Sequence, residues 1–565
     1  MKVLIVGGVA GGASAAARIR RLDENAEIVI FERSGYISYA NCGLPYYIGG
    51  EIEKESSLTL NTPEAFAGRF NVDVRVNADV IAVDSNNKSV CVRNVLTGET
   101  YGEKYDKLIL SPGARPFRPP VDGIESGRIF TLRTVNDTIN IKRYVVENGI
   151  KSAVVVGAGF IGVEMAENLV NLGINTTVVE KIDQVLAPFD YEMACYIQGH
   201  MKEKGVRLCL GTSVMAFEDT EDEIFVVTDK YGKIGSQIVI LAVGVVPDTS
   251  FLDGSGIKMG AKNSISVDEN MRTNIKDIYA VGDAVEIKNI VTGKDTLVPL
   301  AGPANKQGRI AADNICGINS IYKGAQGSSV LKVFDLTAAS TGINERQAKI
   351  EGLNYDIAIL CPPSHATYYP NSKDLVMKVI FSRDSGVILG AQVIGEEGAD
   401  KRCDVLACAV RGKLTAHDLT ELELCYAPPF SSAKDPVNMA GYLIENLLSG
   451  RVKQIHYCDI DGLDREKYFI LDVRKDNEFE EGHIEGAYHI PLDDLRERIG
   501  EINGAKGKII CVCCKTGVRS YNAYRFLTQN GFDCINTAGG YYFYSGVKKG
   551  LFDNAPHHSC GIKIE

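Results

Sequence analysis

The sequence lacks a long apolar run, an export signal and a surplus of basic residues. No stretch of about 18 consecutive apolar residues occurs in the chain, so no membrane-spanning helix is expected. The opening run Met1 to Val6 leads into glycines, which is typical of a buried strand and not of a signal peptide. The formal net charge of -11 argues against nucleic acid as the main partner, because phosphate neutralisation requires a basic surface. We therefore expect a cytoplasmic protein without membrane or nucleic-acid partners.

A disulfide framework is also lacking. The chain has 15 cysteines, an odd number, without regular spacing. We expect reduced thiols, most of them buried as small apolar side chains. A length of 565 residues exceeds what one hydrophobic core serves, which predicts several domains. Only cysteines in special local settings are therefore candidates for chemistry.

Two segments combine a buried strand, a glycine-rich turn and a helix, and this unit is the one repeat we find. Residues 157–162 satisfy the full G-x-G-x-x-G pattern, whereas the first copy keeps Gly7 and Gly12 but has Val9 at the second glycine position. Such turns let backbone N–H groups and a helix N-terminus approach a pyrophosphate. In each copy the next strand ends in a glutamate, placed to bind ribose hydroxyls. The repeat predicts an α/β protein that binds two dinucleotides.

Two further motifs assign the nucleotides. Residues 108–114 resemble the crossing motif of two-dinucleotide flavoproteins, and residues 278–284 resemble their second flavin motif. The resemblance implies FAD at the N-terminal unit and a nicotinamide nucleotide at the second. The carboxylate of Glu180 repels a 2′-phosphate, which favours NADH, while neighbouring Lys181 leaves NADPH as an alternative. The expected FAD ligands are Gly7, Gly8, Ala10, Gly11, Glu32, Arg33, Ser111, Gly113, Gly282, Asp283 and Ala301; the expected NAD(P)H ligands are Gly157, Gly159, Ile161, Gly162, Glu180 and Gly244.

One thiol, Cys42, follows the first ribose-binding glutamate and has no cysteine near it in sequence. Flavin disulfide reductases of the glutathione-reductase type carry a C-x₄-C pair here, but this chain has Ile37 and Tyr47 at the pairing positions, and its next cysteine is Cys91. A single thiol cannot store two electrons as a local disulfide. It must cycle through a mixed disulfide with a small thiol or through a sulfenic acid, unless it is a buried structural cysteine.

Four segments, residues 7–21, 38–46, 300–309 and 426–430, together resemble coenzyme A disulfide reductases over residues 1 to about 450. The resemblance implies a mixed disulfide between Cys42 and coenzyme A (CoA). It also implies an obligate homodimer in which two tyrosines reach the partner's cysteine, Tyr426 and Tyr368, with Tyr369 as a one-residue ambiguity. The implied CoA ligands are Arg18, Arg21, Ser38, Asn41, Cys42 and Arg69. The alternatives are that the arginines simply form a solvated helix face and that the tyrosines occupy ordinary core or surface positions.

The C-terminal part resembles the rhodanese family in residues 471–474, 478–487 and 490–492. The resemblance implies an active loop from Cys514 to Arg519. Backbone N–H groups that point into such a loop lower the thiol pKa and stabilise a persulfide anion, and basic side chains add to the effect.

The register of this loop has an alternative. Counting from Cys513 gives the C-x₅-R spacing of phosphatases, but Gly517 in the fourth loop position and the absence of a histidine before the cysteine favour Cys514. Cys511 and Cys513 are then core residues or resolving thiols. A metal site from Cys511, Cys513, His557, His558 and Cys560 matches no familiar zinc pattern, so no metal is expected. A degenerate docking domain is a further alternative.

The sequence thus predicts two Rossmann-like dinucleotide-binding domains, an α+β dimerisation domain and a C-terminal α/β rhodanese-like domain. The expected boundaries are 1–120 with 255–325 for FAD, 121–254 for NAD(P)H, 330–450 for dimerisation, 451–466 for a linker and 467–565 for the rhodanese-like domain. The expected activity is FAD-dependent NAD(P)H reduction of CoA disulfide, CoA persulfide or polysulfide through Cys42, with Cys514 handling sulfane sulfur. An NADH oxidase or peroxidase that uses a sulfenic acid at Cys42 is the alternative, and a non-enzymatic sulfur carrier or redox sensor is a third hypothesis.

Overall fold

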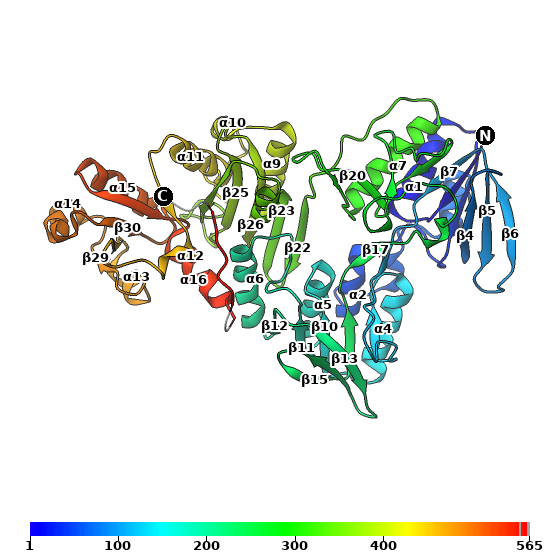
Figure 1. The fold of residues 1–565 in the computed structure, drawn as a ribbon, viewed down its shortest axis with the longest axis horizontal. Helices are drawn as coiled ribbons and strands as arrows, with labels where there is room; N and C mark the ends of the chain where they lie inside the picture. The colour runs from blue at the N-terminus through cyan, green and yellow to red at the C-terminus, as the bar shows by residue number, and fades with distance from the viewer. Residues whose placement is uncertain (553–554, 562–565) are drawn as a thin grey trace. The chain divides into compact units, whose positions relative to one another are not determined.

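A computed structural model describes residues 1–552 and 555–561, and the chain divides into two compact units (Figure 1). The first unit comprises Met1–Val179 and Thr212–Gly327, and the second comprises Glu180–Gly211 and Ser328–Glu565. Parallel and antiparallel sheets with helices make up both units, which confirms the predicted α/β class. Among the residues that the structure describes, no helix combines the length and apolar character needed to cross a bilayer.

The first unit begins with a five-stranded sheet in the order β19-β7-β1-β2-β3, and all its strand pairs are parallel. The apolar run after Met1 forms β1 because it is buried on both faces, as central strands of parallel sheets are. Helices α1 and α7 pack on each other beside this sheet (Figure 1). The elements are β1 (Lys2–Val6), β2 (Glu27–Glu32), β3 (Asp73–Val76), β7 (Lys107–Leu110), β19 (Ile278–Ala280), α1 (Ala10–Leu22), α2 (Leu44–Gly49), α3 (Pro63–Phe70) and α7 (Ala301–Ile315).

Two small three-stranded sheets extend this part of the unit, with orders β4-β5-β6 and β18-β20-β21, and a two-stranded ribbon pairs β8 with β17. Their strands are β4 (Ala78–Asp84), β5 (Ser89–Asn94), β6 (Thr100–Lys104), β8 (Ala114–Pro116), β17 (Val245–Pro247), β18 (Ile265–Ser266), β20 (Val285–Lys288) and β21 (Asp295–Thr296).

The repeat unit recurs in the same compact unit. Strands β11, β10, β16 and β9 run parallel in that order, and α5 follows β10 as α1 follows β1. A hairpin sheet β13-β14-β15 adjoins them in sequence. The elements are β9 (Ile129–Thr131), β10 (Ser152–Val156), β11 (Asn175–Val179), β13 (Val214–Asp219), β14 (Ile224–Thr228), β15 (Gly232–Ser236), β16 (Ile238–Leu241), α4 (Val135–Glu147) and α5 (Phe160–Asn171).

The second unit contains an antiparallel five-stranded sheet in the order β22-β23-β26-β25-β24, against which α9 packs (Figure 1). It is the predicted α+β segment. The elements are β22 (Ser329–Val333), β23 (Leu336–Gly342), β24 (Tyr355–Leu360), β25 (Val376–Ser382), β26 (Ile388–Gly395), α6 (Tyr191–Glu203), α8 (Glu345–Ile350), α9 (Ala399–Gly412), α10 (Ala416–Glu421) and α11 (Pro436–Leu448), with the short β12 (Arg207–Cys209).

A parallel sheet in the order β27-β31-β30-β28-β29 follows in the same unit. Residues 451–466, predicted as a linker, include β27 and α12, and β27 joins this sheet because Gln454 and Ile455 are buried against it. The elements are β27 (Gln454–Ile455), β28 (Tyr468–Asp472), β29 (Tyr488–His489), β30 (Ile509–Cys513), β31 (Asp533–Thr537), α12 (Tyr457–Ile460), α13 (Asp476–Glu480), α14 (Leu495–Arg498), α15 (Val518–Gln529) and α16 (Gly540–Gly550).

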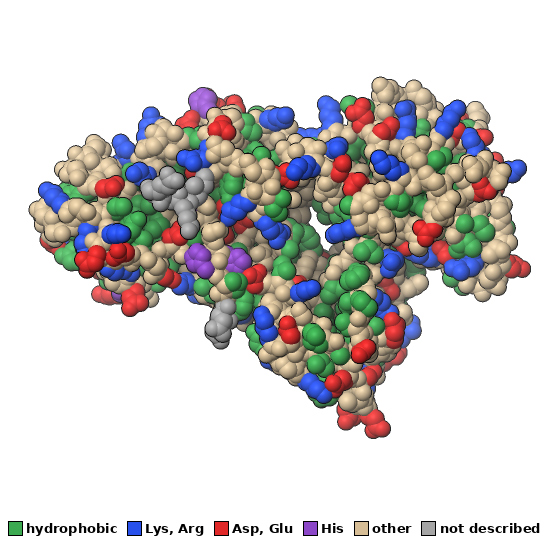
Figure 2. Space-filling model, viewed as in Figure 1, with side chains coloured by type: hydrophobic (Ala, Val, Ile, Leu, Met, Phe, Trp, Pro, Cys, Tyr) green, Lys and Arg blue, Asp and Glu red, His purple; other side chains and the backbone are tan. Residues whose placement is uncertain are grey.

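Acidic and basic side chains alternate over the visible surface, as Figure 2 shows. This face has no broad area of a single charge.

Candidate functional site

The turn after β1 is built so tightly that only glycine fits. Gly7 has φ +94, and a Cβ on it would lie 2.1 Å from the carbonyl oxygen of Ser111. A Cβ on Gly12 would lie 1.9 Å from the carbonyl oxygen of Gly7. The turn therefore brings α1 close to β1 and directs the helix N-terminus at the end of the strand, where a pyrophosphate binds in this fold.

The acid at the end of β2 faces this turn. The carboxylate of Glu32 accepts the Gly8 N–H at 3.0 Å and the Ser34 N–H at 2.9 Å. Beside it lies a cavity of about 300 Å³, at the lower end of the size range of small-molecule sites. Arg33 lines it and pairs with Asp248 at 2.7 Å. The remaining lining residues include Gly7, Phe31, Ala78, Asp79, Val80, Pro112 and Phe251.

The other flavin-motif residues converge on the same turn. A Cβ on Gly11 would lie 2.8 Å from the Ser111 hydroxyl, and one on Gly282 would lie 3.6 Å from it. Asp283 accepts a 2.7 Å bond from Arg133, and the Gly282 N–H donates to Gln307. Gly113 follows β7 with φ +71, Ala10 opens α1, and Ala301 opens α7. The residues present therefore fit an FAD, which Glu32 and Asp283 would help to hold.

Gly12→Ala is expected to yield protein without flavin, because the added methyl displaces α1 from the turn by its clash with the Gly7 carbonyl. The measurement is the ratio of visible flavin absorbance to protein absorbance after purification. Gly68→Ala is the control, since nothing lies within 4 Å of its new methyl. Full flavin content in Gly12→Ala contradicts the assignment of this turn.

The second glycine-rich turn repeats the first. Gly157 has φ +103, and a Cβ on Gly162 would lie 1.9 Å from the Gly157 carbonyl oxygen. None of the described residues comes within 4 Å of a Cβ on Gly159, so the part of the chain that the structure describes leaves this position open to a ligand. Ile161 lies in the first turn of α5, and Gly244 follows β16 with φ +105. Glu180 follows β11 and accepts the Ile182 N–H at 3.0 Å.

Cys42 lies in a single 3₁₀ turn, η1 (Asn41–Gly43), which leads into α2. The residue is exposed at the surface, but the protein around its sulfur raises the thiol pKa above its ordinary value. Glu164 and Asp283 raise this pKa further, and Arg133 opposes them. The charges that act on Cys42 thus include that of Asp283, an expected FAD ligand.

Glu164 is a site residue that the sequence reasoning missed. It lies in α5, two residues after the last glycine of the motif, and the Tyr46 hydroxyl donates to it at 3.4 Å. Burial raises the pKa of this carboxyl to about 7, and nearby Glu167 adds to the shift. Helix α2 approaches α5 so closely that a Cβ on Gly49 would overlap Asn168. The segment that carries Cys42 is therefore attached to the nicotinamide-type helix.

The predicted CoA ligands differ in their exposure and in whether their polar groups already have partners. Ser38 adopts φ 47, and its N–H donates to the Gly8 carbonyl at 2.9 Å. The side-chain oxygen of Asn41 is buried without a hydrogen-bond partner in the part of the chain that the structure describes. Arg18 is paired with Asp313 at 2.6 Å, Arg21 is exposed and lies over the Phe70 ring, and Arg69 is exposed at the end of α3.

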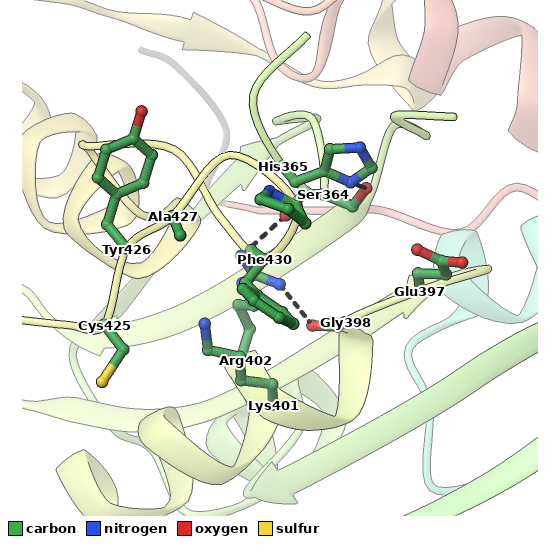
Figure 3. Close-up of a pocket in the computed structure, with 11 residues that line it drawn as sticks. Ser364, His365, Glu397, Gly398, Lys401, Arg402, Cys425, Tyr426, Ala427 and Phe430 are labelled. Atoms are coloured by element: carbon green, nitrogen blue, oxygen red, sulfur yellow. Dashed lines mark hydrogen bonds between the residues drawn. The ribbon is translucent and has the colours of Figure 1, made fainter. Parts of the chain in front are cut away.

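The two predicted tyrosines meet. The hydroxyls of Tyr368 and Tyr426 are 2.9 Å apart, and the side chains are 75% and 47% exposed. Neighbouring Tyr369 packs instead on the His365 ring. Tyr426 borders a cavity of about 480 Å³, and Figure 3 shows Tyr426 and Cys425 pointing in opposite directions from one segment. On this geometry Tyr368 pairs with Tyr426, whereas Tyr369 does not.

The same cavity has a polar floor. Arg402 donates to the carbonyl of Ser364 at 2.9 Å and pairs with Asp435 at 3.1 Å, and Figure 3 shows it bonded to the Gly398 carbonyl. Arg402 therefore fixes the cavity wall and has its charge neutralised by Asp435.

The loop from Cys514 to Arg519 follows β30, the middle strand of the C-terminal sheet. The Cys514 sulfur accepts the Gly517 N–H at 3.1 Å, and the residue is 1% exposed. Arg519 makes two bonds of 2.6 Å to Glu478 in α13, and Lys515 pairs with Asp374 at 2.7 Å. Both cations thus have carboxylate partners, which sequence reasoning did not identify, and the backbone N–H is the donor at the sulfur.

The other cysteines of this domain lie in its core. Cys511 and Cys513 pack with Ile470 and Ile535 on one face of the sheet, while Cys514 packs with Val512 on the other. Neither Cys511 nor Cys513 lies in a group with metal-site geometry within the described ranges 1–552 and 555–561. Two other groups have such geometry: Cys458 with Asp459 and His557, and Glu192 with Glu345 and Cys560. The ammonium of Lys378 already binds both glutamates of the second group.

Comparisons with known proteins agree with this geometry. The model of the pyridine nucleotide-disulphide oxidoreductases matches residues 1–308, that of their dimerisation domain matches residues 328–436, and that of the rhodanese-like domain matches residues 460–545. Coenzyme A disulfide reductase of Staphylococcus aureus (strain Newman) is 37% identical over 443 residues, which are 78% of this chain and 99% of that protein.

Two solved structures resemble almost the whole chain. Reduced Bacillus anthracis CoADR-RHD is 46% identical with a TM-score of 0.94, and the match covers 97% of this chain and 98% of that one. A NAD-dependent persulfide reductase from A. fulgidus is 37% identical with a TM-score of 0.91, over 96% of this chain and 100% of that one. Membership of this family implies FAD and NAD(H) as cofactors. The chain belongs to the pyridine nucleotide-disulphide oxidoreductases, among the relatives of coenzyme A disulfide reductase that carry a C-terminal rhodanese-like domain.

Proposed function

We propose that this chain is an FAD-dependent NADH reductase of CoA disulfide and related CoA persulfides or polysulfides, acting through a Cys42–CoA mixed disulfide. One observation carries the proposal: Cys42 has no cysteine partner. All 15 cysteines lie within the described residues, and each of them is a free thiol. Because a lone thiol needs a second sulfur to hold two electrons, a diffusible thiol must supply it.

The chemistry at Cys42 follows from this pairing. FAD, which the residues around the first glycine-rich turn would hold, would supply two-electron transfer from NADH to a disulfide at Cys42. The Cys42 thiolate attacks one sulfur of CoA disulfide, forms the mixed disulfide and releases one CoA thiolate. Two electrons then cleave the mixed disulfide into two thiolates. Arg133 favours the anionic sulfur at both stages, whereas Glu164 opposes it.

The CoA side of the site draws on the predicted ligands. The buried Asn41 oxygen is an acceptor that a pantetheine amide can satisfy, which offsets the cost of leaving it unpaired. Arg21 is exposed and has no carboxylate within ion-pair distance among the described residues, so it is the better phosphate ligand than Arg18, which Asp313 already neutralises.

The tyrosine pair supports a homodimer with shared sites. Two phenols held 2.9 Å apart at a solvent-exposed position are suited to protonating a leaving thiolate, because one hydroxyl can donate while the other stabilises it. The match to the dimerisation domain supports a homodimer, in which the tyrosine pair would face Cys42 of the partner subunit. Tyr368 and Tyr426 are the proposed proton donors.

The C-terminal loop extends the chemistry to sulfane sulfur. Cys514 is the proposed persulfide carrier, because the Gly517 N–H already points at its sulfur. Glu180 at the nicotinamide turn favours NADH over NADPH.

The test is the mass of the purified protein before and after treatment with a reducing agent. We expect a decrease equal to CoA, located by digestion on the peptide that contains Cys42. The same adduct is expected in Cys91→Ser and absent in Cys42→Ser. No adduct, together with NADH consumption that depends on oxygen or hydrogen peroxide and not on CoA, would favour the sulfenic acid alternative.

A further inference from the structure

The loop that carries Cys514 sits on the end of β24 in the dimerisation domain. Lys515 pairs with Asp374 at 2.7 Å. At the base of the loop, the Tyr541 N–H donates to the Cys514 carbonyl at 2.8 Å. One position before α16, a Cβ on Gly539 would lie 3.0 Å from the Ile359 side chain of β24. The sulfur-transfer loop is therefore seated on a defined segment, residues 359–374, of another domain within the same compact unit.

A second thiol lies in this segment. Cys361 follows β24 directly and is 2% exposed. Its position is fixed by the bond from the Leu375 N–H to the Pro362 carbonyl at 2.8 Å and by the bridge between Pro363 and Asp374. Asp374 therefore makes two contacts: its carboxylate pairs with Lys515, and its backbone pairs with Pro363, next to Cys361 in the same segment.

The charges of the loop act on this thiol. Burial raises the pKa of Cys361 well above its ordinary value, Asp374 and Cys514 raise it further, and Lys515 lowers it. The Lys515–Asp374 ion pair joins the loop to the segment that carries Cys361, so the charges of the loop reach this thiol. Two hydroxyls complete the surroundings: Tyr542, whose N–H donates to the Lys515 carbonyl, and Tyr196, bonded to Tyr542 at 2.7 Å.

The other cysteines near the loop are unsuited to react with Cys514. The side chain of Cys513 packs on the opposite face of the sheet. Cys534 shares the face of Cys514, but its sulfur contacts the Phe532 carbonyl. Cys361 is the thiol that reaches the loop from outside the rhodanese-like domain.

We propose that Cys361 is the resolving thiol of the sulfur-transfer site at Cys514. The Cys361 sulfur attacks the inner sulfur of the Cys514 persulfide anion, and its proton moves to the outer sulfur, which leaves as hydrosulfide. The products are a Cys361–Cys514 disulfide and one hydrosulfide, so atoms and charge balance. The outer sulfur is reduced, the Cys361 sulfur is oxidised, and the Cys514 sulfur keeps its oxidation state. The Gly517 N–H, which donates to the Cys514 sulfur at 3.1 Å, stabilises the persulfide anion.

The disulfide needs a reductant, and a small thiol of the CoA class supplies it. Two such thiols reduce the Cys361–Cys514 bond and become a disulfide, which is the substrate proposed for the Cys42 centre. The inference rests on the proposed function in two respects: the reduction of the Cys361–Cys514 disulfide back to thiols, and the role of Cys514 as sulfur carrier. The release of hydrosulfide itself requires neither flavin, NADH nor Cys42.

The experiment uses the full-length flavoprotein, freed of bound thiols, with thiosulfate or polysulfide as sulfur donor and without NADH. After alkylation and digestion, we expect a disulfide-linked pair of peptides containing Cys361 and Cys514, and about one equivalent of sulfide per chain. Cys361→Ala is expected to retain the persulfide on Cys514 and to release less than about a tenth of that sulfide. Cys534→Ser is the matched control and should behave as the unaltered protein.

Two results would overturn the inference: equal sulfide release from Cys361→Ala, or a persulfide on Cys514 of the unaltered protein that persists without forming the linked peptides. Cys361→Ser serves as a second variant in case the alanine protein unfolds, and the persulfide that either variant carries shows that its loop is intact. Cys42→Ser should release sulfide normally while losing NADH-dependent reduction, which separates the two proposals. Absence of sulfur on Cys514 in every variant refutes its role as carrier and this inference with it.

Discussion

Cys42→Ser is expected to lower NADH-dependent reduction of CoA disulfide by about 1000-fold or more, which corresponds to ~4 kcal/mol of transition-state free energy. A serine hydroxyl cannot form the mixed disulfide, and no second cysteine is bonded to Cys42 to take over its role. The glycine-rich turns and their glutamates are untouched, so reduction of the flavin by NADH should proceed at its normal rate. The variant thus separates reduction of the flavin by NADH from reduction of CoA disulfide through Cys42.

Two measurements check this result: steady-state thiol release from CoA disulfide, and rapid-mixing bleaching of the flavin by NADH. Cys91→Ser is the control, because Cys91 is a partly buried residue of β5 in the same unit and should keep activity within about twofold. Substantial CoA disulfide reduction by Cys42→Ser would mean that electrons reach the substrate without this sulfur, and the proposed function would fail.

The local features of both nucleotide turns could be predicted from the sequence. In each turn the two glycines lie within six residues of each other. A Cβ on the second, Gly162 or Gly12, would overlap the carbonyl oxygen of the first, Gly157 or Gly7. Such contacts depend on backbone geometry that neighbouring residues determine. The alternation of strand and helix, and hence the fold class, could be predicted for the same reason.

Contacts between distant segments could not be predicted. Asp374 lies 141 residues before Lys515, and Glu478 lies 41 residues before Arg519. Neither acid has a local pattern that distinguishes it from a solvated carboxylate. Tyr368 and Tyr426, which are 58 residues apart, were predicted as site residues from a family resemblance and not from their spacing.

The arginines of α1 show what helical periodicity can add. Arg18 and Arg21 are three residues apart and share a face, whereas Arg20 points elsewhere, is buried and donates to five backbone carbonyls. Arg20 therefore anchors α1 to the loops that follow it. The three arginines of α1, although close in sequence, therefore have two different roles.

The largest stability effect is expected at Lys378 of β25, whose side chain is 0% exposed. Its ammonium binds Asp190 at 2.8 Å, Glu345 at 2.5 Å and also Glu192. It thus joins β25 to the N-termini of α6 and α8. Because it holds the pKa of Glu345 at about 2, this carboxylate stays ionised in the folded protein well below its ordinary pKa of 4.5. The stability that it contributes is present above pH 4.5 and is lost as the pH falls toward 2.

Lys378→Met is expected to lower the free energy of local unfolding by about 3–5 kcal/mol, because buried carboxylates then face one another without a cation. Hydrogen exchange of the β25 amides measures this directly, and their protection should fall by about 150- to 5000-fold. Lys349→Met is the matched control: Lys349 also approaches Glu345, at 3.9 Å, but its side chain is 44% exposed, so the expected loss is below about 1 kcal/mol. Adding Glu192→Leu to Lys378→Met should restore part of the protection, since it removes one of the repelling charges. If Lys378→Met exchanges like the control, the carboxylates are able to take up protons or water without cost, and the ammonium is not what holds these three segments together.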